Sequence, residues 1–567
     1  MSFADVRARR QAKDARSLVG SSSSSGPKLI SIEPPEPLFG ALPSSIDIQS
    51  SPERGRGIYA KEPLKRGGTV FSIKPPIYVL STKNLEHFCS SCISPAPPTG
   101  LKRCTQCKNL WYCNATCQNN DWALHKKECA AMQRWAAGAP SLDVAIPAEP
   151  IRCLGRVLWG KRKWGLDSVW TREMDAMQSH RTSLPPEAAE SHTHLAHAVI
   201  RYLGLTAPEE LVPFGINDAA GIVDLISRFA TNSITLTSPS LAPLGVSVSP
   251  LVALVNHSCD PNAVVVFPRS AKDPASQEPE AQLIAIRDIS PGEEIFTSYI
   301  DTTLPRAHRQ EALSATYNFS CGCGFCSRPP APDPREALAC PKTCGGACPF
   351  PSEEDPLTRC VNCKTAVAST DAVLDALRIG QEALQKATHL QFSDLPKAQQ
   401  LTTNMIPILT SAKALPSSHP LLALTRLRQS LLLAAFPSNL TQDALDGLIR
   451  ASSASVTGLN AVFPPGHPTR ALALAELGKL LAVDEPEPRP AAPGSSVFPP
   501  SGPARLRLAC ETLIRARDEL LISFGEHNDG GEVGREVREM VVRVERELAA
   551  WGQGVRNVIE DGAGLKT

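Results

Sequence analysis

Short apolar runs separated by turn residues occur in two stretches, about 54–80 and 250–300, whereas helical spacing dominates the chain after about residue 370. Six of the short runs are rich in β-branched or aromatic residues and are bounded by turn residues, which predicts strands. These predicted strands are 58–60, 69–71, 77–80, 264–267, 283–286 and 295–299. The alternation of predicted strands with cysteine-rich and helical stretches indicates several domains.

A polar heptapeptide, Asn-His-Ser-Cys-Asp-Pro-Asn at 256–262, lies between the apolar runs 251–255 and 263–267. Both flanking runs are expected to be buried strands, so the polar side chains between them need specific partners or water. The heptapeptide contains a titratable ring, His257, and a potential metal ligand, Cys259. Taken alone, it is equally compatible with a tight Asp-Pro turn.

Helices are expected over most of 130–240 and from about residue 370 to the end. His419-Pro420 and His467-Pro468 each precede a series of leucines, at a separation of about 48 residues. Proline is favoured in the first turn of a helix because it has no N–H to leave unpaired there. This self-similarity predicts stacked helical pairs resembling tetratricopeptide repeats.

Composition narrows the class of protein. The 58 Lys and Arg residues nearly balance the 57 Asp and Glu residues, so charge does not indicate a nucleic-acid or membrane-surface protein. No apolar run reaches about 18 residues, and the N-terminus lacks an apolar segment, so neither a membrane span nor a secretory signal is expected. Residues 1–45 are rich in charge, serine and proline, which predicts a disordered tail.

The 18 cysteines are concentrated in three groups, and only Cys153, Cys259 and Cys510 lie outside them. Short spacings between cysteines in a chain without a secretion signal indicate metal binding in a reducing compartment. The first group spans residues 89–129 and contains two sets of four zinc-type ligands. Its members are Cys89, Cys92, Cys104, Cys107, Cys113, Cys117, His125 and Cys129. So small a segment lacks an apolar core and depends on its metal to fold.

The second group, Cys321, Cys323 and Cys326, has only three thiols, whereas a structural zinc site needs four ligands. Cys259 is the nearest ungrouped cysteine and lies in the polar heptapeptide, so we predict that it completes this site. The heptapeptide would then be clamped to the segment after Tyr317.

The third group resembles a zinc ribbon in which five cysteines compete for four places. Cys360 and Cys363 are the firm members. Which two of the first three cysteines join them stays open, with Cys340 and Cys344 as the candidate pair and Cys348 as the competitor. A fourth zinc site is therefore possible here in addition to three expected ones.

The motif Tyr112-Cys113-x3-Cys117-Gln118-x3-Trp122-x2-His125-Lys126 resembles the MYND zinc finger. In that family the ligand pairs interleave. The resemblance implies that one zinc is bound by Cys89, Cys92, Cys113 and Cys117, and the other by Cys104, Cys107, His125 and Cys129. MYND fingers mostly bind peptides, and a local excess of lysine leaves weak nucleic-acid contact open.

Several motifs occur together in one order: Gly55-Arg56-Gly57, the MYND insertion, Asn256-His257-Ser258-Cys259, Tyr299, Tyr317 and the Cys-x-Cys-x2-Cys segment. Together they resemble the SET- and MYND-domain (SMYD) protein lysine methyltransferases, and the ribbon resembles fungal relatives more than animal ones. The resemblance implies an α+β multidomain fold: a SET β-fold with a pseudoknot at Asn256-His257, an inserted MYND finger and helical insert, a post-SET zinc site, the ribbon and an all-α C-terminal domain resembling tetratricopeptide repeats. The expected ranges are 46–88 and 245–302 for SET, 89–129 for the finger, 130–244 for the helical insert, 303–330 for post-SET, 338–366 for the ribbon and 370–567 for the helical domain.

The same resemblance assigns roles to individual residues. It implies Tyr299 as the main active-site tyrosine and Tyr317 as a wall of the lysine channel. The residues that it implies for S-adenosylmethionine are Gly55, Arg56, Gly57, Asn232, Asn256, His257 and Phe319, with Phe319 stacked on the adenine. Cofactor contacts from the helical insert cannot be matched residue by residue.

The expected function is transfer of a methyl group from S-adenosylmethionine to the ε-amine of a protein lysine. The alternative is a non-catalytic adaptor or transcriptional co-regulator in which the finger and the helical domain bind peptides. Expected partners are a protein or peptide substrate and peptide ligands of the finger, with at most weak nucleic-acid binding and no membrane. The expected location is the cytoplasm and nucleus.

Overall fold

The computed structural model describes residues 38–40, 42–269, 278–352, 356–436, 441–487 and 498–552. The chain divides into two compact units, Met1–Gly40 and Ala41–Thr567. Only the turn at 38–40 is described in the first unit, so most of the predicted disordered tail lies outside the described residues. No helix in the described part combines the length and the apolar character needed to span a bilayer.

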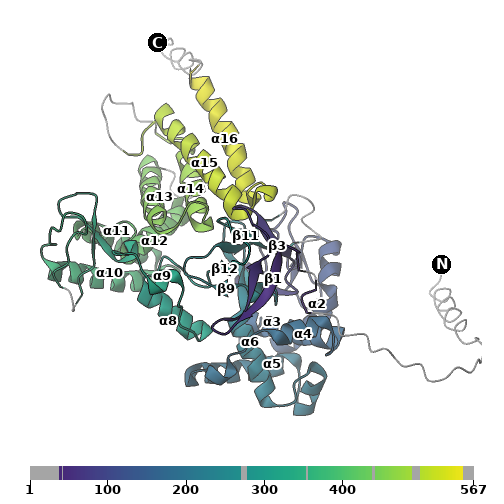
Figure 1. The fold of residues 1–567 in the computed structure, drawn as a ribbon. Helices are drawn as coiled ribbons and strands as arrows, with labels where there is room; N and C mark the ends of the chain where they lie inside the picture. The colour runs from purple at the N-terminus through teal and green to yellow at the C-terminus, as the bar shows by residue number, and fades with distance from the viewer. Residues whose placement is uncertain are drawn as a thin grey trace, which may run out of the picture. The chain divides into compact units, whose positions relative to one another are not determined.

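The strands of the SET region come from two stretches of chain that are far apart in sequence (Figure 1). β1 and β2 form an antiparallel pair. Two further antiparallel sheets have the strand orders β10-β11-β3 and β4-β8-β7. β9 and β12 pair in parallel. Their bounds are β1 Ile46–Ser51, β2 Gly55–Ala60, β3 Thr69–Ile73, β4 Ile77–Leu80, β7 Ser233–Thr237, β8 Pro243–Val248, β9 Asn256–His257, β10 Ala263–Val266, β11 Ala281–Ala285 and β12 Phe296–Thr297. Each of the six predicted strands has a counterpart among them.

One local prediction is wrong. The apolar run 251–255 is not a strand but contains a short 3-10 helix, Val252–Leu254, and Ala253 N–H donates to the carbonyl of Ser249. Five apolar residues fit either structure, and a local hydrogen bond decides between them. The helices of the insert end at Asn232, and β7 begins at the next residue.

A glycine is required in the central strand β8 where it meets β4. A Cβ on Gly245 of β8 would lie 2.0 Å from the carbonyl oxygen of Val79.

The finger contains a small hairpin, β5 Lys102–Arg103 with β6 Trp111–Tyr112, followed by α2 Ala115–Ala137. The Asn114 side chain accepts from Cys117 N–H and caps α2, which starts the helix at the finger's ligands. Since α2 continues beyond Cys129, the finger and the helical insert share one helix rather than meeting at a linker.

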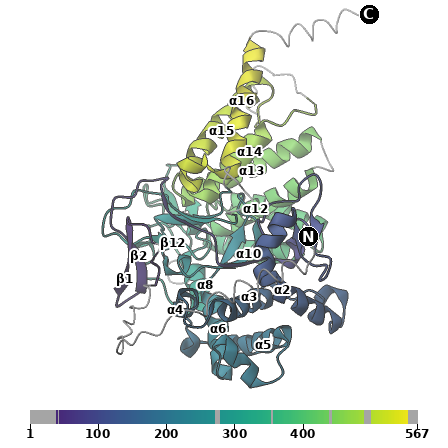
Figure 2. The ribbon, with the colours of Figure 1, turned by 90° about the vertical axis from the view of Figure 1, so that its right-hand side faces the viewer.

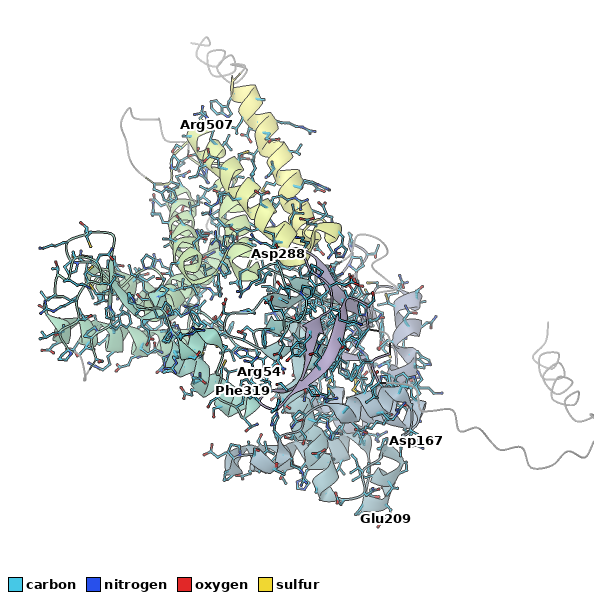
Figure 3. The ribbon with its side chains drawn as sticks, viewed as in Figure 1. Arg54, Asp167, Glu209, Asp288, Phe319 and Arg507 are labelled. Carbon is cyan, nitrogen blue, oxygen red and sulfur yellow. The ribbon has the colours of Figure 1, made fainter. Side chains whose placement is uncertain are left out.

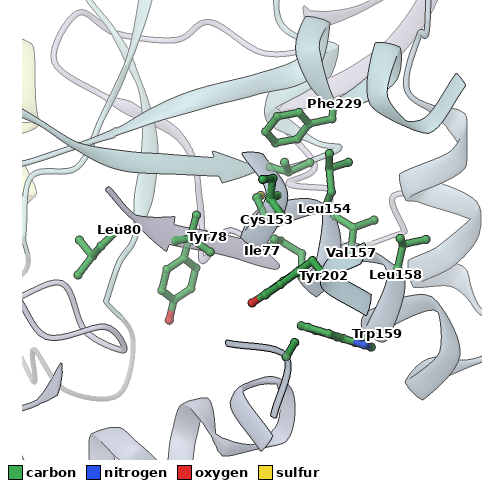
Figure 4. Packing of buried hydrophobic residues seen from close by; sticks show 14 of the residues in the cluster. Ile77, Tyr78, Leu80, Cys153, Leu154, Val157, Leu158, Trp159, Tyr202 and Phe229 are labelled. Atoms are coloured by element: carbon green, nitrogen blue, oxygen red, sulfur yellow. The ribbon is translucent and has the colours of Figure 1, made fainter. Parts of the chain in front are cut away.

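The helical insert consists of α3 Glu149–Trp164, α4 Val169–Ala176, α5 Pro186–Leu203 and α6 Ala219–Asn232. Side chains from β4, α3, α5 and α6 form one buried cluster, which Figure 4 shows. Gly155 of α3 allows the ring of Tyr202 to approach, because a Cβ at this position would lie 2.9 Å from that ring. The insert is therefore packed onto the SET strands through α3.

The post-SET and ribbon regions follow β12. They contain α8 Arg306–Tyr317, α9 Gly324–Ser327, β13 Ala337–Ala339 and β14 Ala347–Pro349. β13 pairs with β14. It also bonds to the helical region that follows the ribbon, since Ala339 N–H donates to Lys413 O at 2.7 Å. The ribbon is thus attached to the helical domain by backbone hydrogen bonds.

Short 3-10 helices occur throughout the described part of the chain. They are Thr82–Asn84, Leu142–Val144, Arg181–Ser183, Pro208–Phe214, Val252–Leu254, Pro334–Glu336 and Glu526–Asn528.

The C-terminal region is helical, as predicted, and each helix packs against the next one along the chain; Figure 2 shows α13 to α16 as neighbours. The bounds are α10 Thr370–Leu390, α11 Leu395–Ser411, α12 His419–Ala435, α13 Gln442–Val462, α14 Pro468–Leu481, α15 Pro503–Phe524 and α16 Gly531–Gly552. Both His-Pro pairs lie at helix starts, with Pro420 and Pro468 in the first turns of α12 and α14. The repeat in sequence therefore corresponds to a repeat of helix starts.

One hydrophobic core is shared by the SET sheet and the last helices. Val264 and Val266 of β10 and Ile284 of β11 are buried in the same cluster as residues of α13 to α16. At its edge, Asn528 Nδ2 donates to Gln282 Oε1 at 2.6 Å, and both residues are buried. The SET sheet therefore has one face covered by the helical domain.

Candidate active site and metal centres

The post-SET metal centre is formed by Cys259, Cys321, Cys323 and Cys326, whose sulfur atoms all lie within 4.8 Å of one another. Gln310 of α8 holds Cys321 in place: Cys321 N–H donates to its Oε1, and its Nε2 donates to Cys321 O, both at 2.8 Å. Four thiols in this arrangement suit the tetrahedral coordination of zinc. The structure thus brings the heptapeptide cysteine to the three later ones.

Positive charge is buried beside these thiols. Arg309 is fully buried, and its Nη2 lies 4.0 Å from Cys326 Sγ. The guanidinium groups of Arg309 and Arg335 lie over the ring of Phe325, with distances of 4.8 and 4.9 Å to its centroid. Four thiolates around one zinc carry a net negative charge, which a buried guanidinium can balance.

His257 connects this metal centre to the predicted active-site tyrosine. Its Nδ1 accepts the backbone N–H of Tyr299 at 3.0 Å, and its Nε2 lies 3.3 Å from Cys259 Sγ. Because Nδ1 is an acceptor, the neutral ring carries its proton on Nε2, directed at the sulfur. Burial lowers the pKa of His257 to about 4, which keeps the ring neutral at physiological pH.

Tyr299 and Tyr317 face each other at the end of this chain of contacts. Their ring centroids are 4.9 Å apart, and the hydroxyl of Tyr299 donates to Val255 O at 2.7 Å. The hydroxyl of Tyr317 donates to Tyr299 O at 3.4 Å. Burial raises the pKa of both phenols, so both stay protonated near neutral pH. The structure therefore brings the two predicted catalytic residues together.

The ring of Phe319 also lies near His257, with ring centroids 6.0 Å apart. Asn318 ends α8 in the left-handed conformation, φ 60°, and this turns the chain so that Phe319 packs beside the cysteine cluster. Its side chain is half-buried, so part of the ring remains accessible. Phe319 and Arg54 are labelled in Figure 3.

The Gly55-Arg56-Gly57 segment lies against Asn256. Asn256 Nδ2 donates to Arg56 O at 3.1 Å and to Glu294 Oε1 at 2.7 Å. Gly55 has φ +70°, a conformation that glycine adopts without strain. A Cβ on Gly57 would lie 2.5 Å from Glu294 Oε1, so only glycine fits between the strand and these polar groups.

Asn232 is linked to this region through the segment 176–178. Asn232 Nδ2 donates to Gln178 O at 2.7 Å, and the Arg56 guanidinium donates to Ala176 O. The segment 176–178 begins with the last residue of α4 and belongs to the helical insert. No cofactor residue could be assigned in this insert from sequence. Together these contacts connect the predicted cofactor residues from both halves of the SET region.

Glu294 and the segment 176–178 were missed in the sequence. Glu294 belongs to the turn Gly292-Glu293-Glu294 before β12, and two adjacent glutamates ahead of a predicted buried strand were the signal available. The segment 176–178 contributes backbone carbonyls, which leave no trace in the choice of residue types.

The finger holds two metal centres whose ligands interleave along the chain. Within each set the ligand atoms lie within 4.8 Å of one another. The sets are Cys89, Cys92, Cys113 and Cys117, and Cys104, Cys107, His125 and Cys129. Both match the pairing that the resemblance implied, and both donor sets suit zinc.

A buried ion network joins the second finger centre to the helical insert. His125 Nε2 faces the thiols, and its Nδ1 lies 3.4 Å from Glu128 Oε2. Arg156 of α3 pairs with Glu128 at 2.5 Å and with Asp121 at 2.9 Å. Since all of these side chains are buried, the carboxylate that orients the metal-binding imidazole is itself held by the insert.

The ribbon centre consists of Cys340, Cys344, Cys360 and Cys363, which are within 4.8 Å of one another. Cys348 is not in this set; it is fully buried on β14 and belongs to an apolar cluster with Leu338 and Val373. The open choice among the first three cysteines is thus resolved by the structure, and Cys348 contributes to the core instead.

A family model for the SET domain matches residues 55–300. The N-lysine methyltransferase SMYD2-A of Xenopus laevis is 31% identical over 292 residues, covering 50% of this chain and 61% of that protein. Human N-lysine methyltransferase SMYD2 is 32% identical over 288 residues, covering 49% and 59%. The chain thus spans about three fifths of the length of the relatives it matches.

Among solved structures, the SET domain of LSMT bound to lysine and AdoHcy aligns with a TM-score of 0.24 and 11% identity, over 89% of this chain and 88% of that one. That score is too low to support a structural inference. Residues 55–300 thus match the SET domain, and about half of the chain is similar to the SMYD2 N-lysine methyltransferases.

Proposed function

We propose that this protein transfers a methyl group from S-adenosylmethionine to the ε-amine of a lysine in a protein substrate. The observation that carries the proposal is the position of β9: Asn256 bonds to residue 56 at the start of β2, and His257 bonds to Tyr299. The two residues of β9 thus connect the segment proposed for the methyl donor with the tyrosine pair proposed for the amine. The names of the SMYD2 relatives support the same reaction.

The residues fit the cofactor in their chemistry. Gly55 is exposed and has open space at its Cβ position, so a ligand can approach its backbone closely, and the half-buried ring of Phe319 offers a face for an adenine. When bound, S-adenosylmethionine would supply an electrophilic methyl group on its sulfonium. Asn232, Asn256, Gly55, Arg56 and His257 complete the set of residues proposed to hold it.

Tyr299 and Tyr317 are proposed to receive the lysine. Their adjacent, tilted rings exclude water and stabilise positive charge near the amine, and this desolvation lowers the pKa of the lysine so that it reacts as a free amine. Holding the amine in line with the donor supplies about 7–11 kcal/mol of the barrier through orientation. Both phenols are protonated, so neither acts as a base at neutral pH without transferring its proton elsewhere.

The proposal is tested in two steps with the full-length, zinc-loaded protein. Calorimetry should detect one S-adenosylmethionine per chain. Incubation with isotope-labelled cofactor and a cell extract, followed by mass spectrometry, should then identify labelled lysines in proteins. Absence of cofactor binding would contradict the proposal and favour the adaptor alternative.

We also propose that the finger binds a peptide. Trp122 is 37% exposed on α2, and its ring lies 5.9 Å from that of the metal ligand His125, so an apolar side chain is presented at a rigid position. Lys126 and Lys127 follow on the exposed surface, which favours an acidic peptide over an uncharged one. Titration of labelled peptides against wild type and Trp122→Ala tests this, and salt-dependent binding of duplex DNA instead would contradict it.

A location in the cytoplasm and nucleus stays part of the proposal. It is supported by the four thiolate-rich centres, because zinc–thiolate sites persist where thiols stay reduced. Imaging of a fluorescent fusion in cells tests it, and a secreted or membrane-bound signal would contradict it.

A further inference from the structure

Glu294 holds together three segments around the proposed cofactor site. Its Oε1 accepts from Asn256 Nδ2 at 2.7 Å, and its Oε2 accepts from Arg54 Nη1 at 3.0 Å and from the Tyr59 hydroxyl at 3.2 Å. Its side chain is only 7% exposed, whereas that of Arg54 is 45% exposed. One buried carboxylate therefore connects β9, the turn before β2, and β2 itself.

The backbone around Glu294 is fixed independently of its side chain. Ile295 N–H donates to Ile58 O at 2.8 Å, and Ala60 N–H donates to Glu293 O at 3.0 Å. The carboxylate is thus presented from a turn whose backbone is hydrogen-bonded to β2 rather than from a free loop. Its position would change little if the side chain lost its charge, and this makes the side chain's contribution separable from the fold.

Gly57 and Asn256 both depend on where this carboxylate lies. A Cβ on Gly57 would be 2.5 Å from Glu294 Oε1 and 2.8 Å from Asn256 Nδ2, so the β2 backbone at Gly57 packs directly against these two side chains. Both hydrogens of the Asn256 amide are used, one for Glu294 and one for Arg56 O. Since both partners are acceptors, the amide orientation is unambiguous.

The amide oxygen of Asn256 is consequently the atom left for a ligand. Within the part of the chain that the structure describes, Oδ1 accepts no hydrogen bond from protein and is not among the buried unpaired atoms. An acceptor held in one orientation, beside a glycine backbone, suits a donor group of a bound nucleoside or amino acid.

We propose that Glu294 is a positioning residue for methyl transfer: it orients the Asn256 amide and holds the start of β2, residues 55–57, for S-adenosylmethionine without touching the cofactor. The inference rests on the proposed function, since it assigns Asn256 and residues 55–57 to the cofactor. Arg54 pairs with the Glu294 carboxylate from the solvent side, while the other carboxylate oxygen accepts from the amide.

The test compares Glu294→Gln with Glu293→Gln in the full-length protein. Gln has one acceptor oxygen and cannot serve Asn256 and the Arg54 and Tyr59 donors together, so affinity for S-adenosylmethionine in calorimetry should fall about 10- to 100-fold. At saturating cofactor, kcat should stay close to that of the wild type. Glu293 accepts from Asn262 and Ser290 and makes no contact with Asn256, so its variant should bind like the wild type.

A double-mutant cycle asks whether Glu294 acts through Asn256. In the Asn256→Ala background, Glu294→Gln should cost less affinity than it does in the wild type, because the shared contact is already gone. Full additivity of the two losses would overturn the positioning role. Unchanged affinity in Glu294→Gln would overturn it as well.

The outcomes separate the inference from the proposed function. If the wild type binds no S-adenosylmethionine, the proposed function fails and this inference fails with it. If the wild type binds and Glu294→Gln binds equally well, only the inference fails. Zinc content and melting temperature are measured for each variant, with Glu294→Asp as a second variant that keeps the charge. If both Glu294 variants lose the fold, Glu294 is a structural residue and the positioning role is overturned.

Discussion

The backbone N–H of Tyr299 donates to Nδ1 of His257 at 3.0 Å, while the other ring nitrogen of His257 lies 3.3 Å from the sulfur of Cys259. A single imidazole therefore spans from a metal ligand to the proposed catalytic tyrosine. Displacement of the zinc centre would be transmitted to the tyrosine through one rigid ring.

Replacement of His257 by Ala should lower methyl transfer by about 10- to 100-fold, the range typical of groups that orient metal ligands. The Tyr299 N–H would lose its acceptor and Cys259 would lose a donor. Steady-state kinetics with labelled cofactor measure the loss. Zinc content should stay within one equivalent of the wild type, and full activity would contradict the role of this ring.

Replacement of Cys259 by Ser should remove one of four zinc equivalents and abolish transfer together, because the thiol closes the post-SET centre. Metal analysis by mass spectrometry and the transfer assay measure the two effects. Cys510→Ser is the matched control, since Cys510 lies in α15 outside all four centres and should retain its zinc. A Cys259 variant with all its zinc would show that the thiol is not a ligand.

Replacement of Tyr299 by Phe should keep cofactor and zinc binding but lower kcat by about 100-fold or more, as expected for loss of one oriented polar group at a reacting centre. The ring remains, so packing against Tyr317 is preserved, and only the hydroxyl that donates to Val255 O is lost. Tyr202→Phe is the matched control, because the buried Tyr202 hydroxyl has no hydrogen-bond partner among the residues that the structure describes. Equal kcat in the Tyr299 variant and its control would refute the assignment.

Replacement of Glu128 by Gln should weaken the second finger centre about 10- to 100-fold in zinc affinity. It should also destabilise the protein by about 3 kcal/mol, because Arg156 loses one of its two buried carboxylates. Asp121→Asn separates the two effects, since Asp121 pairs with Arg156 but makes no hydrogen bond to His125 among the described contacts. Zinc release to a chelator and denaturant unfolding provide the measurements; equal zinc loss in both variants would contradict the orienting role of Glu128.

His467 should make the protein sensitive to acid. Its ring stacks on Phe463 at 3.8 Å, and burial lowers its pKa from 6.5 to about 4. The unfolded chain therefore binds a proton between pH 6.5 and 4 that the folded chain does not, and stability falls as the pH drops through this window. Relative to His467→Phe, the wild type should lose about 2 kcal/mol between pH 7.5 and pH 5. Urea unfolding at both pH values measures this, and identical pH dependence of the two proteins would contradict it.

Much of the site was predictable because its ligands are chemically distinctive. Thiols at x2 and x3 spacings indicate metal, and the three-thiol group without a fourth ligand pointed to Cys259. The His-Pro pairs predicted the starts of α12 and α14 because proline fits the first turn of a helix.

The parts that were missed depend on contacts between distant segments. Glu294 is important because Asn256, Arg54 and Tyr59 converge on it, and its sequence position shows only a turn. The strand predicted for 251–255 was wrong because a run of five apolar residues is compatible with both a strand and a 3-10 helix. The exclusion of Cys348 from the ribbon centre follows from the register of β14, which places it in the core.

The core that β10 and β11 share with α13 to α16 has a practical consequence for producing this protein in parts. A fragment ending after the post-SET cysteines would expose Val264, Val266 and Ile284 as a contiguous apolar sheet face. Such a face on open strands is a template for aggregation, so the SET portion should be insoluble alone and recover when the helical domain is co-expressed. The helical domain is therefore expected to be needed for the solubility of the SET sheet, because it covers the apolar face of β10 and β11.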